Sequence, residues 1–406
     1  MTDAPRSLPV PLVGAEAATA FVAEHLSHLV SGPVAGSTSI RGGQRAADAA
    51  LASFDVAGYA AKRNEVAPVE RRGASRLSPY IRHGLLQLRQ VWDAVEGGPS
   101  RDVSKFRDEL LWQEFARHWY ARLGSHTRLG VRRELASSTS AAGWDRSMRC
   151  IDETVGELEA DGWLVNQTRM WLSSQWAIRD MHRWQDGEAE FFRHLLDGSR
   201  AANRLGWQWT TGVGSSKHYG FSRWQVRKRA PGMCDSCVHN TACPIEDWPQ
   251  DPTFQPVERP VEVKQVLDLL EVSGPVSPVT LGKPEVVWLT AESLGTNDPA
   301  LLAHPALPVL FVFDEPLLRT LQLSAKRLVF LVETLAEIAE TRDLRLVLGR
   351  PASVLQIEEF AVTFAPVPGF RRIVEELQPV DMRPWPWLRQ PASGSVASFS
   401  AWRKHT

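Results

Sequence analysis

The sequence predicts a two-domain protein in which an all-helical domain is followed by a small parallel α/β, Rossmann-like domain. Between about residues 44 and 232, apolar residues recur at intervals of three and four, as in DELLWQEFARHWYARL, which is typical of helices with one buried face. After residue 282 the pattern changes to short, nearly all-apolar segments such as EVVWLT and ALPVLFVFD, separated by helical patterns. Such segments are typical of strands buried on both faces of a sheet. A chain of 406 residues is also too long for one ordinary core.

The domain boundaries follow changes in composition. Residues 1–40 are rich in Pro, Ala, Gly and Ser and are interpreted as a lead-in or linker, and residues 41–245 as the helical domain. A Pro-rich linker with one short helical pattern covers 246–282, and the α/β domain covers 283–406. No GxGxxG or Walker-type loop follows the first strand of that domain, so the sequence marks no dinucleotide or triphosphate site there.

Charge and hydropathy limit the possible partners. With 43% hydrophobic residues and a formal net charge of −1, the chain has no global basic excess, so any contact with DNA must come from a local patch. No apolar run reaches the roughly 20 residues of a membrane helix, and the N-terminus lacks a signal-peptide layout. We therefore expect a cytoplasmic protein with no membrane partner and no obvious protein partner.

Tryptophan is unusually common, with 16 Trp against 4 Tyr. Most of these side chains are expected to fill the core of a large helical domain. Because indole rings also pass single electrons, a Trp-rich interior favours a redox or light-driven function as well.

The four cysteines are predicted metal ligands. They are Cys150, Cys234, Cys237 and Cys243, the last three forming C-x2-C-x5-C in a loop bounded by Gly and Pro. A reducing compartment disfavours structural disulfides, and thiols at this spacing are typical of a metal site. Spacing alone allows either zinc or an iron–sulfur cluster.

The segment Gly162–Gly214, GWLVNQTRMWLSSQWAIRDMHRWQDGEAEFFRHLLDGSRAANRLGWQWTTGVG, resembles the flavin-binding core of class I DNA photolyases and cryptochromes. Two upstream pieces, GASRLSPYIRHG and DELLWQEF, agree with the family in order and spacing. The resemblance covers about residues 40–245 and implies a photolyase-type FAD-binding domain. It implies that FAD is bound by the following residues: Tyr59, Ser75, Arg76, Leu77, Ser78, Asn166, Arg169, Asp197, Ser199 and Asn203.

The resemblance also assigns chemistry to some of these positions. Ser75 and Ser78, ahead of a helix, would offer hydroxyl and N–H groups to the FAD pyrophosphate, although such residues are often only helix caps. Arg169 and Asp197 match an ion pair beside the isoalloxazine ring, and Asn203 matches the position facing flavin N5. Ser199 departs from the family, which commonly has a second Asp there, so the chain reads DGS rather than DGD.

The implied catalytic residues are Glu109, Trp112, Asn203, Trp207 and Trp184. Trp207 and Trp184 match the first two positions of the family's photoreduction chain. The third, outermost Trp has no counterpart, and Trp144 is a nearby substitute. Glu109 and Trp112 match the residues that contact a flipped cyclobutane dimer, the Glu by hydrogen bonding and the Trp by stacking. Asn166, in NxxRM, resembles the dimer-repairing branch rather than the (6-4) branches.

The cysteines resemble those of a bacterial branch that carries a [4Fe-4S] cluster. Cys150 sits twelve residues before Gly162, and GSSKHYGFSRWQVRKRAPGMCDSCVHNTACP resembles that branch's segment leading to its Cys triplet. This resemblance favours an iron–sulfur cluster on all four thiolates over zinc. The basic run of Arg223, Arg227, Lys228 and Arg229 before the triplet is either a solvated face or a contact for DNA phosphates.

The second domain resembles the family's antenna domain, which is normally N-terminal. The likeness rests on VVWLTAESLGTNDPALLAHPALPVLFVFDEPLL, and the final SVASFSAWRKHT resembles the segment that normally leads from antenna to flavin domain. The domains are therefore expected to be circularly permuted, and the sequence does not identify an antenna chromophore.

Taken together, the resemblance implies a light-dependent repair enzyme, a deoxyribodipyrimidine photolyase-like lyase whose partner is damaged DNA. Two alternatives stay open at this point: a cryptochrome-type blue-light photoreceptor without repair, and a light-independent flavin/iron–sulfur protein. Ser199 and the missing third Trp motivate the last alternative.

Overall fold

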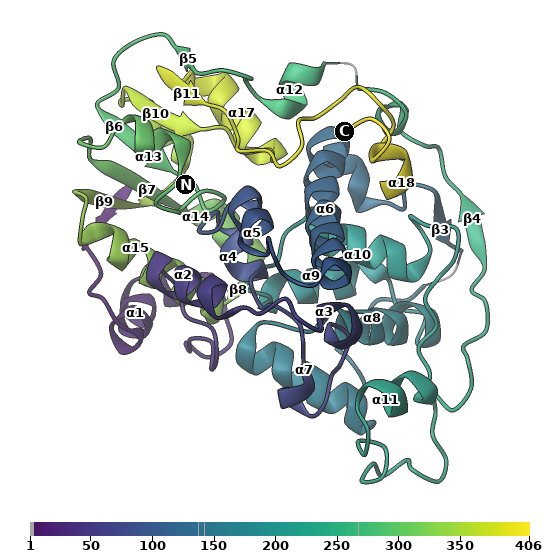
Figure 1. Ribbon diagram of the computed structural model, residues 1–406. Helices are drawn as coiled ribbons and strands as arrows, with labels where there is room; N and C mark the ends of the chain where they lie inside the picture. Colours follow the sequence, from purple (N-terminus) through teal and green to yellow (C-terminus); the bar gives the residue numbers. More distant parts are fainter. Residues whose placement is uncertain (1–3, 137, 142, 267) are drawn as a thin grey trace.

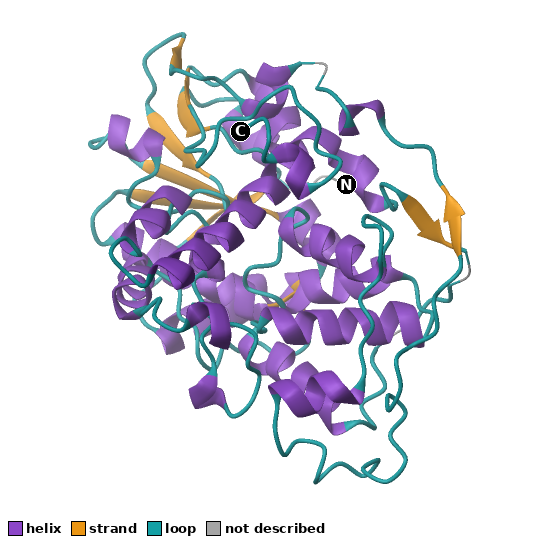
Figure 2. Cartoon of the chain, turned by 45° about the vertical axis from the view of Figure 1, so that its right-hand side comes forward, coloured by secondary structure: helices purple, strands orange, loops and turns teal. Residues whose placement is uncertain are grey.

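The computed structural model describes residues 4–136, 138–141, 143–266 and 268–406. A β-sheet with its covering helices occupies one end of the molecule, and a larger helical domain occupies the other (Figure 1). Figure 2 shows the strands of this sheet gathered together, with a separate two-stranded ribbon on the far side of the helices. No helix among the described residues is long and apolar enough to cross a membrane.

The sheet has seven strands in the order β1-β9-β7-β6-β10-β11-β5. Neighbouring strands from β9 to β11 run parallel, and β1 and β5 are antiparallel edge strands. All four residues of β6 and of β10 are buried, as the uninterrupted apolar segments predict for a sheet covered on both faces. The bounds are β1 Arg6–Leu8, β5 Val279–Thr280, β6 Val286–Leu289, β7 Val309–Asp314, β9 Leu344–Gly349, β10 Phe360–Thr363 and β11 Asp381–Arg383.

The helices of the α/β domain begin at clear sequence signals. Asp298 accepts hydrogen bonds from the first N–H groups of α13, and Asp314 caps α14 in the same way. Proline occupies the first turn of four of these helices, where no N–H is needed. The helices are α13 Pro299–Ala303, α14 Glu315–Leu321, α15 Ala325–Ala339, α16 Pro351–Leu355 and α17 Pro368–Leu377.

The N-terminal segment belongs to the α/β domain, so the prediction that residues 1–40 are only a lead-in or linker is wrong. β1 adds to the edge of the sheet beside β9, and β2 (Val30–Ser31) pairs in parallel with β8 (Leu323–Ser324). Between them, α1 (Ala15–Phe21) and a following π-helical turn pack on α15. The sequence did not indicate this role, because the segment is rich in Pro and Gly and an edge strand of three residues needs no long apolar pattern.

The helical domain is built around α6, a 24-residue helix. Gly162 and Gly212 end α7 and α10 in the left-handed conformation, which glycine adopts without a Cβ clash. The predicted linker 246–282 adds β4 (Phe254–Pro256), which pairs with β3 (Arg133–Leu135), and the short helix α12 (Leu269–Ser273). The other helices are α2 Gln44–Ser53, α3 Tyr59–Lys62, α4 Ser78–Arg82, α5 Leu88–Ala94, α6 Ser100–Leu123, α7 Arg149–Asp161, α8 Asn166–Ser174, α9 Trp184–His194, α10 Ala202–Thr211 and α11 Arg223–Arg229.

The two domains share their largest apolar core. This core joins Leu110 and Phe115 of α6 to Leu328 and Phe330 of α15. A second core, within the helical domain, contains Cys150, and a third lies on the other face of the sheet. The last helix, α18 (Phe399–Trp402), packs on α6 rather than on the sheet, so the C-terminal end of the predicted 283–406 domain lies on the helical domain.

Candidate functional site

One large cavity of about 1830 Å³ lies between the helical domain and the α/β domain. Helices α4, α6, α8, α9 and α10 supply much of its wall, and the other domain contributes residues that include Leu318, Arg327, Val367 and Arg371. Ligand pockets commonly measure about 300–1,000 Å³. The cavity is therefore large enough for more than one ligand.

Most of the predicted site residues line this cavity. The structure brings together Tyr59, Ser75, Arg76, Ser78, Glu109, Trp112, Asn166, Arg169, Asp197, Ser199, Asn203 and Trp207. Leu77 and Trp184 are not among the described residues that line it. The side chain of Leu77 is fully buried in the core, and Trp184 donates a hydrogen bond from Nε1 to Glu134 Oε1 at 2.9 Å.

The segment before α4 has an unusual backbone. Arg76 has a φ of 58°, a left-handed conformation that is uncommon for a residue with a side chain. Its guanidinium lies 5.1 Å from the centre of the Trp163 ring, and it also bonds Ser39. Ser78 Oγ accepts a hydrogen bond from Trp163 Nε1 at 3.1 Å. These contacts fix the turn that carries Ser75 at one end of the cavity.

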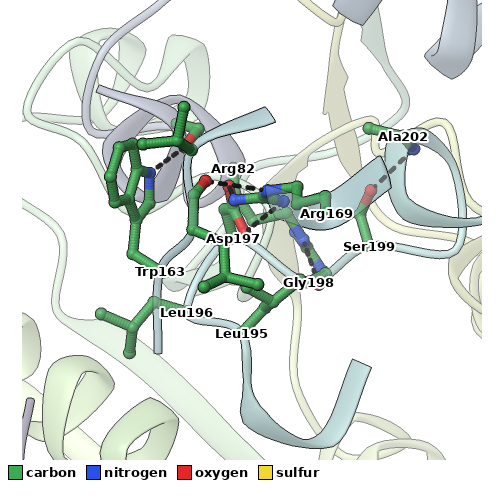
Figure 3. A network of polar contacts seen from close by, with 12 residues as sticks. Arg82, Trp163, Arg169, Leu195, Leu196, Asp197, Gly198, Ser199 and Ala202 are labelled. Atoms are coloured by element: carbon green, nitrogen blue, oxygen red, sulfur yellow. Dashed lines mark hydrogen bonds and ion pairs between the residues drawn. The ribbon is translucent and has the colours of Figure 1, made fainter. Parts of the chain in front are cut away.

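Arg169 and Asp197 form a two-pronged ion pair (Figure 3). The two Nη–Oδ distances are 3.2 and 2.8 Å, and Arg169 Nε also donates to the Leu164 carbonyl at 3.0 Å. The Asp197 side chain is only 7% exposed. Bidentate pairs of this kind hold both side chains in one orientation. The pair therefore presents a fixed cation and carboxylate at the cavity wall.

The loop that carries Asp197 is held from two sides. Arg82 donates to the Gly198 carbonyl at 3.1 Å and pairs with Glu292 at 2.5 Å (Figure 3). Arg327, on α15, donates to the carbonyl oxygens of Phe192 and Leu195. Burial, followed by the positive charge of Arg82, lowers the pKa of Arg327 to about 9, so the side chain stays charged at neutral pH.

Ser199 has a local structural partner. Its Oγ accepts a hydrogen bond at 3.0 Å from the N–H of Ala202, the first residue of α10 (Figure 3). This bond satisfies one of the N–H groups that a helix start leaves open. The residue that departs from the family pattern thus stabilises the beginning of α10.

His83 bridges the loop that carries Asp197 and the α/β domain. Its two ring nitrogens face the carbonyl oxygens of Ala291, at 2.8 Å, and Leu196, at 3.1 Å. Burial, followed by the charge of Arg82, lowers the pKa of His83 to about 3. A neutral imidazole has a single N–H, so it donates to one of these two carbonyls.

Asn203 is oriented by a buried carboxylate. Its Nδ2 donates to the backbone oxygen and to Oε1 of Glu188, at 3.1 and 3.2 Å. Glu188 also pairs with Arg200 and, at 3.4 Å, with Arg204. The amide of Asn203 is therefore held in one orientation at the cavity wall.

Glu109 and Trp112 lie one turn apart on α6 and face the same cavity. The carboxylate of Glu109 contacts Lys105 Nζ at 2.8 Å and Arg63 Nε at 3.3 Å. Nearby, burial and then the charge of Glu109 raise the pKa of Tyr59. The α6 side of the cavity thus offers one carboxylate, held by two cations, and one indole ring.

A series of aromatic rings leads away from the cavity at Trp207. The centre of the Trp207 ring lies 5.1 Å from Phe191, Phe191 lies 5.8 Å from Trp144, and Trp144 lies 4.8 Å from Trp176. Trp144 is half-buried, whereas the other three are buried. Trp184 is not in this series, so the series passes through Trp144 rather than through the predicted second position.

The four cysteines meet around one small hollow. Cys150 lies in the first turn of α7, and Cys234, Cys237 and Cys243 approach it from the loop after α11. Burial, followed by the neighbouring thiols, raises the pKa of Cys150 to about 12. No group of three or more His, Cys, Asp or Glu in the described part of the chain is arranged to hold a metal ion.

The basic run before the cysteine triplet lies away from the cavity. It forms α11, and none of its described residues lines the cavity wall. Arg223 points to the cysteine hollow and pairs with Glu246 at 2.6 Å, and Arg229 pairs with Glu65 at 3.0 Å. The hypothesis that this run contacts DNA phosphates at the cavity mouth therefore lacks support from the fold.

Several cavity residues were missed by the sequence reasoning. Met170 follows Arg169 directly, and Trp209 lies two positions after Trp207, so both were close to a recognised motif. Arg327 and the α17 residues Arg371 and Arg372 also reach the cavity from the α/β domain. No motif marks these arginines, because only the packing of the two domains brings them to the site.

Residues 106–231 match a family described as the FAD binding domain of DNA photolyase. Deoxyribodipyrimidine photo-lyase of Thermus thermophilus is 34% identical over 188 residues, which cover 42% of this chain and 43% of that protein. The enzyme of the same name from Escherichia coli is 29% identical over 165 residues, covering 35% and 34%. The chain thus spans less than half the length of these curated relatives. Among solved structures, a Synechocystis cryptochrome shares 19% identity at a TM-score of 0.44, covering 50% of this chain and 46% of that one.

The sequence matches indicate a photolyase-type FAD-binding domain over residues 106–231. Over the aligned part, the chain is similar to the deoxyribodipyrimidine photo-lyases.

Proposed function

We propose that this protein is a light-dependent DNA repair enzyme that splits cyclobutane pyrimidine dimers with an electron from reduced FAD. The observation that carries the proposal is a single cavity whose wall contains both the flavin-side residues, such as Arg169 and Asp197, and the α6 pair Glu109 and Trp112. The curated relatives are named deoxyribodipyrimidine photo-lyases, which supports the same reaction.

The residues at the cavity fit FAD. The volume exceeds that of an ordinary ligand pocket, and the cavity wall carries the fixed Arg169–Asp197 ion pair. When bound, FAD supplies a light-excited one-electron donor.

The chain's own residues would prepare the reaction. The fixed Arg169 guanidinium would stabilise negative charge on the flavin ring. The side-chain amide of Asn203, held in one orientation, would lie next to that ring. Trp112 would stack on a base flipped out of the duplex, and the Glu109 carboxylate would accept hydrogen bonds from the edge of that base. The walls would exclude water, so that these charges act with little screening.

The reaction is tested by exposing the reduced protein and a thymine-dimer oligonucleotide to blue light. We expect loss of the dimer under light and none in the dark. A Trp112→Ala variant should lose most of this activity, whereas Trp224→Ala, an exposed tryptophan on α11, should keep it. Dimer loss that does not exceed the dark control would refute the proposal.

We further propose that Cys150, Cys234, Cys237 and Cys243 ligate a [4Fe-4S] cluster. All four line one hollow, and four thiolates are the usual ligands of such a cluster. The resemblance of the cysteine segment to that of the iron–sulfur branch favours a cluster over zinc. Analysis for iron and acid-labile sulfide tests the assignment. Zinc without sulfide would overturn it.

The domain order supports a circular permutation, which we also propose. The part of the chain that matches the photolyase FAD domain ends at residue 231, before the parallel strands that begin at β6. The antenna-like domain would therefore follow the flavin domain instead of preceding it.

A cryptochrome-type photoreceptor is the second candidate function. The ring series from Trp207 to the half-buried Trp144 favours it, because such a series would carry electrons from the surface to the cavity without any DNA. Flavin photoreduction with no dimer splitting would support this candidate. If photoreduction is unchanged in Trp207→Phe, the series does not carry the electrons.

A further inference from the structure

Phe399, near the C-terminus, is stacked on Trp112. The two ring centres are 4.1 Å apart, and the ring planes differ by 10°. Trp112 lines the cavity, whereas Phe399 is not among the described residues that line it. Phe399 therefore covers the indole face that is turned away from the cavity and leaves the opposite face open to it.

The helix that carries Phe399 is fastened to the same helix as Trp112. Trp402 is buried and donates from Nε1 to His118 Nδ1, on α6, at 2.8 Å. Because Nδ1 accepts this bond, the proton of neutral His118 lies on Nε2, which faces the Arg389 carbonyl at 3.0 Å. Four-residue α18 would not be stable alone, so these contacts hold it in place.

Two further contacts flank the stack. Arg403 pairs with Asp108 of α6 at 2.5 Å, one turn before Trp112. Phe115 meets both rings edge-on, with centres 5.9 Å from Trp112 and 5.9 Å from Phe399. The Trp112 indole is therefore confined on its rear face and on one edge.

Confinement of this kind lowers the cost of binding. A half-buried indole at a cavity wall can adopt several rotamers, and ordering such a side chain on binding costs free energy. A stack on one face keeps the other face presented to the cavity before a ligand arrives. The free energy of stacking a base on that face is then available for binding.

We propose that Phe399 is a positioning residue that holds Trp112 ready to stack on the flipped base of a DNA lesion. The inference rests on the proposed function, since it takes Trp112 as the surface that receives the base. It gives the C-terminal helix a part in substrate binding, although that helix does not touch the substrate.

The test compares Phe399→Leu, which removes the ring but keeps an apolar side chain, with Phe399→Tyr, which keeps the ring. The control is Phe370→Leu, which removes a buried ring from the α/β core. We measure the Kd for a thymine-dimer oligonucleotide and for the same undamaged oligonucleotide, the FAD content, and the splitting of pre-bound dimer in a single turnover.

In Phe399→Leu we expect the dimer Kd to rise about tenfold, the effect of losing an aromatic pair, with FAD content and single-turnover splitting unchanged. Phe399→Tyr and Phe370→Leu should bind like the parent protein. Unchanged binding by Phe399→Leu, or equally weakened binding by Phe370→Leu, would overturn the inference. If the parent protein itself binds dimer and undamaged DNA equally, the proposed function fails first, and that result is visible without any variant.

Discussion

At the scale of single residues, charged groups at the cavity are held by specific partners. Arg169 meets Asp197 through two hydrogen bonds, and Glu188 orients Asn203 while it pairs with Arg200. Buried charges of this kind are stable only when each has its partner. Removal of one member therefore leaves the other charge buried in a low-dielectric environment without a partner.

Asp197→Asn should weaken FAD binding. The amide cannot balance the charge of Arg169, and loss of a charged hydrogen bond of this kind costs roughly 1.5–3 kcal/mol, or about 10- to 100-fold in affinity. The ratio of FAD to protein and the Kd for reconstitution with FAD measure the effect. Glu358→Gln, which removes a pair with half-exposed Arg345 far from the cavity, is the control and should leave both values unchanged. Full FAD retention in Asp197→Asn would show that the pair does not support the cofactor.

His83 should make the fold sensitive to acid. Its pKa is about 3 in the folded protein and about 6.5 when unfolded, so the unfolded chain binds more protons between these values. The free energy of unfolding should therefore fall as the pH drops below about 6.5, by up to about 1.4 kcal/mol per pH unit from this residue. Urea unfolding at a series of pH values measures the slope.

The slope should become smaller in His83→Asn, because that variant has no group to protonate at this position. His126→Asn, which removes an exposed histidine, should keep the parental slope. Equal slopes in all three proteins would mean that His83 is protonated in the folded state, with both ring nitrogens donating to their carbonyls.

At the scale of elements, close helix packing places the aromatic side chains around the cavity. Gly187 lies inside α9, and a Cβ at this position would lie 2.2 Å from the Trp207 ring of α10. The glycine therefore lets α10 approach α9 closely enough for Trp207 to reach the cavity wall. The sequence shows a glycine in a helical pattern but does not show which ring lies against it.

Gly187→Ala should destabilise the protein by about 1–3 kcal/mol, because the added methyl group must displace a buried indole. Thermal unfolding and FAD content are the measurements, and both should decrease. Gly156→Ala is a matched control within α7, where the nearest atom belongs to Arg146 at 3.7 Å. The control should be neutral or stabilising by up to about 1 kcal/mol, since alanine favours a helix more than glycine does. A fall in stability of the same size in both variants would contradict the packing argument.

At the scale of the whole molecule, the two domains are joined by a shared core and by contacts across their boundary. Their largest core is shared, and α15 of the α/β domain carries Arg327 to the backbone of α9 beside the Asp197 loop. Gly198 leaves room for this contact, because a Cβ there would lie 2.0 Å from the Arg327 guanidinium. The α/β domain is thus part of the wall of the cavity.

Arg327→Met should therefore destabilise the helical domain as well as the α/β domain, which contains Arg327. The change leaves the carbonyl group of Phe192 without its Arg327 donor, while that of Leu195 keeps the N–H of Gly198, and an unsatisfied buried group costs about 1–3 kcal/mol. We expect lower stability and lower FAD retention, with one unfolding transition seen by both flavin fluorescence and circular dichroism. Arg345→Met, on the outer part of the sheet, should change neither. Separate transitions for the two probes would show that the domains unfold independently.

The helical domain and most of the cavity residues could be predicted from the sequence, because they lie in local motifs with fixed spacing. The motif that carries Arg169 and Asp197 lies within some thirty residues, and a helix period fixes which side chains share a face. The four cysteines were likewise expected to act together. In these cases the relevant contacts are close in the chain or belong to one recognised pattern.

Only the tertiary structure decided which distant segments complete the site. The edge strand from residues 6–8, the contact of Arg327 with α9, and the stack of Phe399 on Trp112 each join parts of the chain more than a hundred residues apart. Such contacts leave no periodic signal, because they depend on how whole helices and strands pack. The sequence by itself therefore determined a photolyase-type flavin domain, whereas packing determined that the α/β domain and the C-terminal helix are built into its cavity.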